Sequence, residues 1–287
     1  YNLDNDSNNV LIGYGAGSAL TDQGRSIAIG YEALNKLTQS GNVDDIAIGY
    51  QAMKEMTQTA STNYIASNVA IGNFSMKGSS GNSTDCYSNT AVGTNTLSTI
   101  TTGVKNSVLG DDAGAAITSA TNNTFMGYQS GLALVDGTSN TAMGMLSLST
   151  DCEDHNTAIG YNALKVCTSS DNTAVGAYAG DEITSGERNT AVGHSALGAD
   201  AGNDSVGIGY QALEASTGAT NTAIGVYASK RMVGASSTVA IGYNALSAVA
   251  TQNSTVAIGT NALAALTSGD GNVAVGWQSL IACNTAD

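Results

Sequence analysis

One short motif recurs along the entire chain of 287 residues, a pentapeptide of the type Asn-Thr-Ala-Ile-Gly. Its last residue, here called the marker glycine, occurs sixteen times, and most steps between markers are 16 or 17 residues. Three longer steps of 19, 23 and 21 residues separate Gly30 from Gly93. A near-constant period predicts a single repeat domain over residues 1–287. The marker glycines are Gly13, Gly30, Gly49, Gly72, Gly93, Gly110, Gly127, Gly144, Gly160, Gly176, Gly193, Gly209, Gly225, Gly242, Gly259 and Gly276.

The residues before each marker glycine follow a strand pattern. Numbered from the marker, position −3 is β-branched in fifteen of sixteen copies, −2 is Ala in twelve, and −1 is always aliphatic or Met. Such residues favour strands, in which −3 and −1 share one face. A helical repeat needs about 33 residues or more. The sequence therefore predicts an all-β fold: an elongated parallel β-solenoid (β-roll) of about sixteen coils of 16–23 residues. The absence of proline agrees with this prediction.

The composition of each coil suggests more than one subunit. We expect positions −3 and −1, with the common Leu or Met at +4, to form a thin core. The alanines at −2 and the Ala, Ser or Thr at +3 would then form flat strips that another backbone can approach. This interpretation predicts a homotrimer, and the competing one is a monomeric solenoid with alanines packed inside. Asn fills −4 in eleven copies, either as a stacked amide ladder or because it tolerates a left-handed backbone.

The charge balance argues against a nucleic acid partner, and the lengths of the apolar stretches argue against insertion into a membrane. Lys and Arg number 9 against 23 Asp and Glu, for a net charge of −14. A chain with so few cations lacks the surface that binds phosphates, so we expect no nucleic acid partner. No apolar stretch approaches the roughly 20 residues that span a bilayer, so we expect no membrane insertion.

Two well-conserved copies carry a family resemblance. The segment from Asn156 to Leu164 reads Asn-Thr-Ala-Ile-Gly-Tyr-Asn-Ala-Leu, and the segment from Ser237 to Leu246 is very similar. They resemble the head repeats of trimeric autotransporter adhesins, and resemble still more the repeat arrays of bacteriophage tail fibres. The resemblance implies a trimeric parallel β-roll that serves as a shaft or a receptor-binding head. A period longer than the adhesin coil, with no visible heptad stalk or membrane anchor, favours the phage branch.

The expected function is therefore a non-enzymatic structural and adhesive segment of a phage tail fibre, acting in host attachment. Its partners would be two sister chains, a host cell-surface glycan or protein receptor, and other virion or fibre proteins. The expected location is extracellular, on the virion tail fibre. The alternatives are the head of a bacterial trimeric surface adhesin, on the cell surface, and a polysaccharide-degrading phage spike.

Residues that could support catalysis are few. His155 and His194 occupy columns that polar residues or Tyr fill elsewhere, and Ser195 is only a sequence neighbour of His194. Paired carboxylates could cleave a glycan, and the candidate pairs are Asp111 with Asp112 and Asp181 with Glu182. Neighbours in sequence usually point apart, so we interpret these pairs as solvated turn charges and predict no catalytic residue and no cofactor.

Acidic side chains in expected turns could bind calcium. None has the spacing of an EF-hand, and the glycine-rich calcium-binding nonapeptide is missing. We therefore predict no metal site. The groups considered are Asp44 with Asp45, Asp151 with Glu153 and Asp154, and Asp200 with Asp204.

Two of the four cysteines are separated by almost one coil. Cys152 and Cys167 are 15 residues apart, so they could lie one above the other. A disulfide between successive coils and a pair of buried thiols are both compatible with this spacing. Cys86 and Cys283 have no obvious partner.

Two features of the repeat could contact a receptor: its longer, irregular coils and the Tyr column after the marker glycine. The two longest steps insert residues at 54–64 and 76–89, and insertions project as loops that often carry recognition. The candidate contact residues there are Tyr64, Lys77 and Tyr87. Tyr also follows the marker glycine in seven copies, where it packs on its neighbours or stacks on sugar rings.

Overall fold

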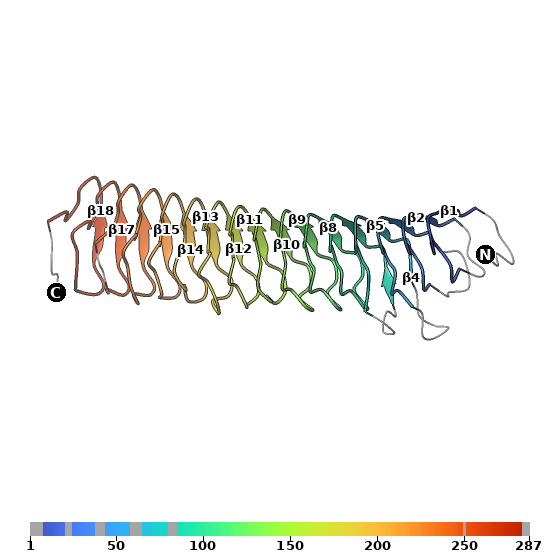
Figure 1. The fold of residues 1–287 in the computed structure, drawn as a ribbon. Helices are drawn as coiled ribbons and strands as arrows, with labels where there is room; N and C mark the ends of the chain where they lie inside the picture. The colour runs from blue at the N-terminus through green and yellow to red at the C-terminus, as the bar shows by residue number, and fades with distance from the viewer. Residues whose placement is uncertain are drawn as a thin grey trace. The chain divides into compact units, whose positions relative to one another are not determined.

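The computed structural model of the protein describes residues 8–20, 25–37, 44–57, 65–79, 85–248 and 251–282. The chain divides into two compact units, Tyr1–Asp151 and Cys152–Asp287. Each is a parallel β-solenoid in which successive short strands lie side by side (Figure 1). The described residues include no helix of the length and apolar character needed to cross a membrane. An all-β solenoid is thus confirmed, while the prediction of one domain over the whole chain stays a prediction.

The first unit forms one main parallel sheet in the order β1-β2-β3-β5-β7-β8-β9-β10. Two further strands, β4 and β6, pair with each other in parallel, so part of the expected loop at 76–89 is paired backbone. The strands are β1 (Val10–Ile12), β2 (Ile27–Ile29), β3 (Ile46–Ile48), β4 (Ile65–Ala66), β5 (Val69–Ile71), β6 (Cys86–Tyr87), β7 (Thr90–Val92), β8 (Ser107–Leu109), β9 (Thr124–Met126) and β10 (Thr141–Met143).

The second unit repeats this arrangement from β11 to β18 in chain order. Eight marker strands in each unit enclose seven complete turns, which gives about fourteen turns for the sixteen predicted coils. The strands are β11 (Thr157–Ile159), β12 (Thr173–Val175), β13 (Thr190–Val192), β14 (Val206–Ile208), β15 (Thr222–Ile224), β16 (Val239–Ile241), β17 (Val256–Ile258) and β18 (Val273–Val275).

Pairing between strands is in register, so each column of the repeat becomes a row of equivalent residues. Thr157 faces Thr173, and Ala158 faces Ala174. The marker glycines allow this stacking because successive turns approach closely there. Gly176 has φ +135°, and a Cβ on it would lie 2.7 Å from the carbonyl carbon of Gly193. A side chain is thus excluded by both space and backbone conformation.

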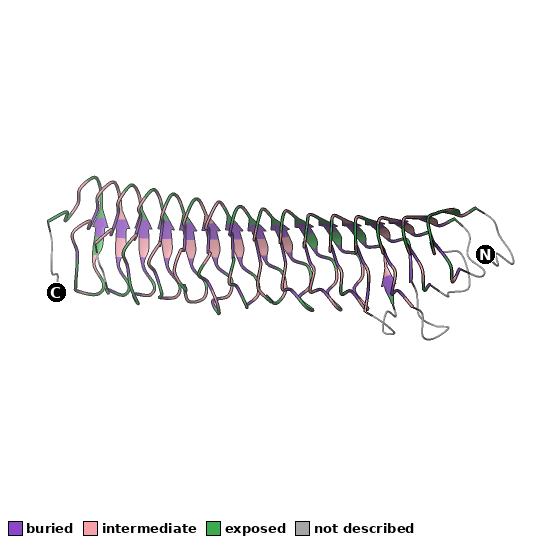
Figure 2. Ribbon diagram, viewed as in Figure 1, coloured by how far each residue is buried: buried purple, intermediate pink, exposed green. Residues whose placement is uncertain are grey.

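The strands bury the face opposite to the one expected, whereas the Leu or Met at +4 is buried in most coils as expected. All twelve alanines at −2 are buried, as are fifteen of the sixteen small residues at +3. Every described residue at −1 is instead exposed or half-buried (Figure 2). The prediction that alanine strips face sister chains is wrong, and the competing prediction of interior alanines is confirmed. The narrow coil explains this result, because opposite walls leave room for little more than Ala beside the Leu or Met at +4.

Large residues at −2 are accommodated within the same coil. Leu11 and Phe125 replace the usual alanine, and in their coils +4 is Gly17 and Gly131. A Cβ on Gly17 would lie 2.7 Å from Leu11 Cδ2, and one on Gly131 would lie 2.3 Å from Phe125 Cε2. In these two coils the large side chain at −2 thus fills the space that Leu or Met at +4 fills in most other coils, which keeps the interior closely packed.

The asparagines at −4 form the ladder that was one of two expectations. Asn89 Oδ1 accepts the backbone N–H of Asn106 at 3.0 Å and its side-chain Nδ2 at 3.0 Å. In the second unit Asn156 Oδ1 accepts the backbone N–H of Asn172 at 2.9 Å. Left-handed residues sit instead at −5, as at Lys105 with φ 57°. The column therefore exists to satisfy buried backbone donors, which would be costly to leave unpaired.

Candidate recognition surface

The aliphatic column, defined as the sixteen residues at −1, lies on the outer face of the strands. Ile159, Ile208, Ile224 and Ile241 are 36 to 39% exposed, and Met126 is 45% exposed. Because equivalent residues are in register, these side chains form a continuous apolar stripe on each unit. A stripe of this kind marks a contact surface more often than a scatter of single apolar residues does.

An aromatic ladder runs beside this column in each unit. In the second unit neighbouring ring centroids are 5.1 to 6.1 Å apart along the whole series. Phe74, Tyr178 and Tyr227 belong to the ladders although they stand at +2, in coils where +1 is not aromatic. The sequence analysis missed these three because it followed the +1 column alone. The ladders are Tyr14, Tyr31, Tyr50 and Phe74, and Tyr161, Tyr178, His194, Tyr210, Tyr227 and Tyr243.

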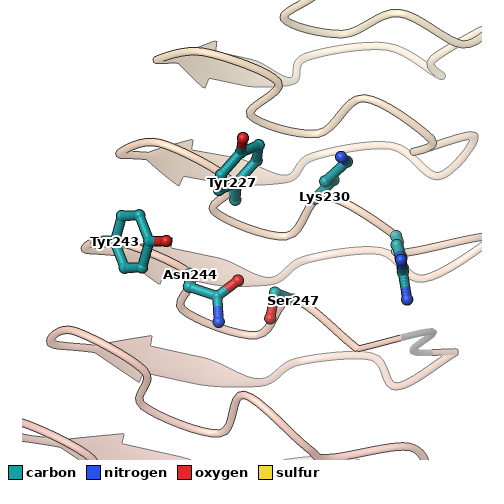
Figure 3. Close-up of a pocket in the computed structure, with 6 residues that line it drawn as sticks. Tyr227, Lys230, Tyr243, Asn244 and Ser247 are labelled. Carbon is teal, nitrogen blue, oxygen red and sulfur yellow. The ribbon is translucent and has the colours of Figure 1, made fainter.

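A groove of about 320 Å³ opens between two successive coils of the second unit. Lys230 Nζ lies 4.8 Å from the centroid of the Tyr227 ring, donates to Gln211 Oε1 at 2.8 Å, and is 3.5 Å from Glu214 Oε2. Figure 3 shows Tyr227 and Lys230 on one coil and Tyr243 on the next. The groove therefore joins aromatic, cationic and polar groups, and its lining is Tyr227, Lys230, Arg231, Tyr243, Asn244 and Ser247.

A second groove, of about 380 Å³, lies in the first unit and contains one predicted contact residue, Lys77. Lys77 Nζ lies 5.7 Å from the centroid of the Phe74 ring. Tyr87 does not line this groove; it is in β6, where its carbonyl oxygen accepts the N–H of Lys105. Tyr64 falls outside the described residues. The lining is Phe74, Lys77, Gly78, Asn95, Ser98 and Thr99.

The two carboxylate pairs considered for glycan cleavage have different surroundings in the structure. Asp181 and Glu182 line a groove of about 390 Å³ that Glu214 also lines, and burial raises the pKa of Asp181. Asp112 accepts from the side-chain amides of Asn95 and Gln129. Those hydrogen bonds indicate a structural role for Asp112, whereas Asp181, Glu182 and Glu214 line one groove.

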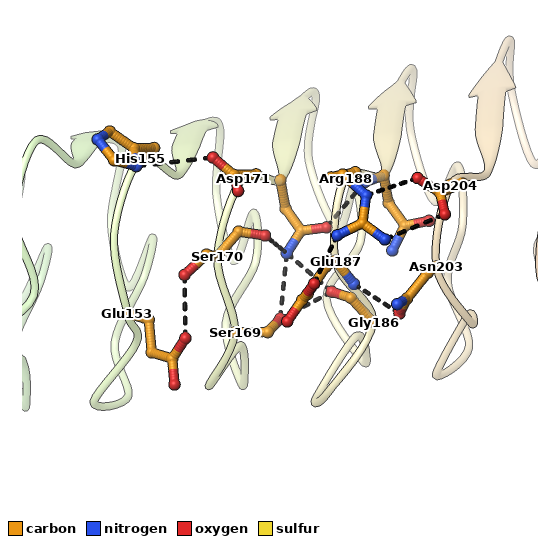
Figure 4. Close-up of polar contacts among 12 residues, drawn as sticks. Glu153, His155, Ser169, Ser170, Asp171, Gly186, Glu187, Arg188, Asn203 and Asp204 are labelled. Carbon is orange, nitrogen blue, oxygen red and sulfur yellow. Dashed lines mark hydrogen bonds and ion pairs between the residues drawn. The ribbon is translucent and has the colours of Figure 1, made fainter.

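Exposed charges at −5 link successive coils (Figure 4). Arg188 donates to Asp204 through Nε at 2.7 Å and through Nη2 at 3.1 Å. His155 Nδ1 lies 3.6 Å from Asp171 Oδ1. These contacts explain His155 and Asp204 as members of an alternating surface row, and exposed pairs of this kind add little stability.

Other acids considered for calcium accept hydrogen bonds from neighbouring coils. Asp200 Oδ1 accepts the N–H of Thr184 at 2.8 Å, and Asp151 Oδ1 accepts the N–H of Val135 at 2.8 Å. Glu153 accepts from the hydroxyl of Ser170 at 3.0 Å. Within the described ranges no three His, Cys, Asp or Glu side chains gather as a metal-ligand set.

Asp45 is a buried acid in the asparagine ladder. It occupies position −4, and its Oδ1 accepts the backbone N–H of Asn68 at 2.8 Å and the side-chain Nδ2 at 3.2 Å. Its Oδ2 is buried without a hydrogen-bond partner among the described residues. Burial raises the pKa of Asp45 to about 6. Asp44, next to it, is exposed and pairs with Arg25 at 2.8 Å.

Three cysteines are buried thiols. Cys86, Cys152 and Cys167 are not joined by a disulfide in the structure, which agrees with the second of the two alternatives for Cys152 and Cys167. Burial raises the pKa of the Cys86 and Cys167 thiols, which keeps them in the unreactive protonated form. Cys283 lies outside the described residues.

This burial predicts slow thiol chemistry. In the native protein we expect Cys86, Cys152 and Cys167 to resist alkylation by iodoacetamide, and to react fully in denaturant without any reductant. Peptide mapping by mass spectrometry reads each cysteine separately. Labelling of Cys152 and Cys167 only after reduction would instead establish the disulfide.

Comparison with known proteins gives no match to a protein-family model, a curated protein or a solved structure.

Proposed function

We propose that the protein is a non-enzymatic structural and adhesive fibre segment that assembles as a homotrimer, as part of a phage tail fibre. The resemblance of its repeat to tail-fibre arrays supports the phage assignment and an extracellular location. The alternative is that the chain is the head of a bacterial trimeric surface adhesin. The observation that carries the proposal is the exposed aliphatic column, which is present in register on both units.

The size of this column supports association with sister chains. At roughly 70 Å² for each of eight side chains, it exposes on the order of 500 Å² per unit, as much as the largest apolar patches of typical monomers. The adjoining aromatic ladder extends this surface toward the roughly 800 Å² per partner of a stable interface. A second copy is a suitable occupant because its own column has the same spacing and the same apolar character.

Charge placed on the column should separate the subunits. Three copies of the 28.7 kDa chain have a mass of 86.1 kDa, which light scattering measures directly. Replacing Ile224 and Ile241 by Asp in one variant should lower the mass to that of the monomer, because two charges would be buried at each contact. Val233→Asp is the control, since Val233 is 46% exposed but stands outside the column.

Circular dichroism confirms that each variant remains folded. A wild-type mass of 28.7 kDa would contradict the assembly, and so would equal dissociation by the Val233→Asp control.

The second candidate function is polysaccharide cleavage, and the observation in its favour is the acidic groove of Asp181, Glu182 and Glu214. A glycosidase needs one protonated and one ionised carboxyl group, and burial raises the pKa of Asp181 in the required direction. Incubation with host capsule or lipopolysaccharide followed by chromatography separates the two functions. Release of sugar fragments that Asp181→Asn abolishes would replace the non-enzymatic proposal.

A further inference from the structure

The two grooves that contain a lysine over an aromatic ring are built from the same positions of the repeat. Each has an aromatic residue at +2 and a Lys at +5 of one coil. Each also has an Asn at +2 and a Ser at +5 of the next coil. The residues are Phe74, Lys77, Asn95 and Ser98 in the first unit, and Tyr227, Lys230, Asn244 and Ser247 in the second.

This combination is rare within the repeat. Lys occupies +5 in four coils, and beside Lys54 and Lys165 the residue at +2 is Gln51 or Asn162 rather than an aromatic. An Asn at +2 with a Ser at +5 occurs in just two coils, and each follows a coil with the aromatic–lysine pair. Independent drift of sixteen coils would not be expected to place all four residue types together twice.

The chemistry of the Lys77 groove, in the first unit, suits a carboxylated sugar. Within the described residues the Lys77 ammonium has no ion-pair partner; Lys77 is a half-buried residue, and its Nζ lies over the Phe74 ring. A half-buried ammonium offers a carboxylate a charge-assisted hydrogen bond that is stronger than one to a neutral group. Asn95 and Ser98 add the neutral hydrogen-bonding groups that sugar hydroxyls require.

The Lys230 groove, in the second unit, offers the same groups with an additional cation. Asn244 Nδ2 donates to Asn261 Oδ1 at 3.0 Å, so its own Oδ1 faces the groove in Figure 3. Lys230 is partly neutralised by Glu214, but Arg231 is exposed and has no ion pair among the described residues. Tyr243 is 52% exposed, and a pyranose can stack on its ring.

The negative charge of the whole chain does not prevent this binding. Exposed charges farther away than about 8 Å are largely screened at physiological salt, so the groups in the groove dominate. We propose that the two grooves are equivalent sites for an acidic saccharide, whose carboxylate binds the lysine while its hydroxyls bind Asn and Ser. This inference rests on the proposed adhesive function and specifies the chemical class of the receptor.

Calorimetry with an oligogalacturonate as the probe tests this proposal. We expect two sites per chain, and at least tenfold weaker binding of the methyl-esterified oligomer, which has the same sugars without the charge. Lys77→Gln and Lys230→Gln should each remove one site, and the double variant should remove both. Lys165→Gln is the matched control, because Lys165 also stands at +5 but the residue at +2 of its coil is Asn162 rather than an aromatic.

Three results would overturn the proposal: no binding by the wild type, equal binding of the ester, or equal loss in Lys165→Gln. Light scattering on the same samples keeps the two proposals distinct. A trimer that does not bind the probe contradicts the saccharide sites alone, whereas a monomer contradicts the fibre assembly.

Discussion

Alanine in place of the marker glycine Gly209 is expected to destabilise the second unit by about 4 kcal/mol, as the sum of backbone strain and overpacking. Gly209 has φ +133°, a conformation that residues with a Cβ rarely adopt. The new Cβ would also lie 2.5 Å from the carbonyl oxygen of Gly225. That oxygen belongs to the backbone of the next coil, which cannot move without disturbing the strand pairing. Urea unfolding followed by circular dichroism measures the effect.

Gly234→Ala provides the matched control. Gly234 has φ +72°, and no atom lies within 4 Å of the position of its Cβ. This substitution retains a backbone penalty of about 1 kcal/mol but adds no steric clash. If both variants lost the same stability, close approach of the coils would not explain the marker glycines.

The second large effect concerns stability: the buried carboxyl group of Asp45 should make the free energy of unfolding depend on pH. The pKa of Asp45 is about 6 in the folded protein, against 3.8 as the ordinary value. At pH below 3.8 both states bind the proton, and the buried group is neutral. As the pH rises from there to about 6, unfolding releases a proton, so stability falls. At pH 7 the free energy of unfolding is lower by about 3 kcal/mol than it would be without this pKa shift, at about 1.4 kcal/mol per pKa unit.

Asp45→Asn should remove this loss, because Asn is the usual residue of the ladder and carries no charge. We expect the variant to be more stable than the wild type at pH 7 and equal to it near pH 4. Asp44→Asn is the control, since Asp44 is exposed on the neighbouring position. Thermal unfolding of the three proteins from pH 4 to pH 7 gives the comparison. A wild-type stability that does not change over this range would contradict the buried charge.

The strands could be predicted from the sequence, but not which of their faces is inside. Alternation correctly places Thr157 and Ile159 together on one face and Ala158 on the other. Hydrophobicity then favoured Ile159 as the core residue. The structure buries Ala158 instead, because the width of the coil limits the size of an interior side chain. That width depends on contacts between turns, which a strand pattern does not describe.

The candidate site was predictable only in part, for a related reason. Lys77 was identified from an irregular step, and its ring partner Phe74 stands at +2 of the same coil, outside the aromatic column that was followed. The facing Asn95 comes from the next coil, and its proximity requires the register between coils, which the pairing of β5 with β7 provides. A signal was present in the sequence: the aromatic–lysine and Asn–Ser pairs recur together at Tyr227 and Asn244.

In-register pairing also determines how such a chain can change in length. Removing one whole period and rejoining the ends brings together two coils that already present the same columns, as Thr173 and Val206 do on either side of Thr190. Deleting one residue inside a strand would turn its buried alanine outward. Recombination between copies of the repeat can therefore lengthen or shorten the protein in whole periods, whereas a single-residue deletion within a strand would disrupt its core.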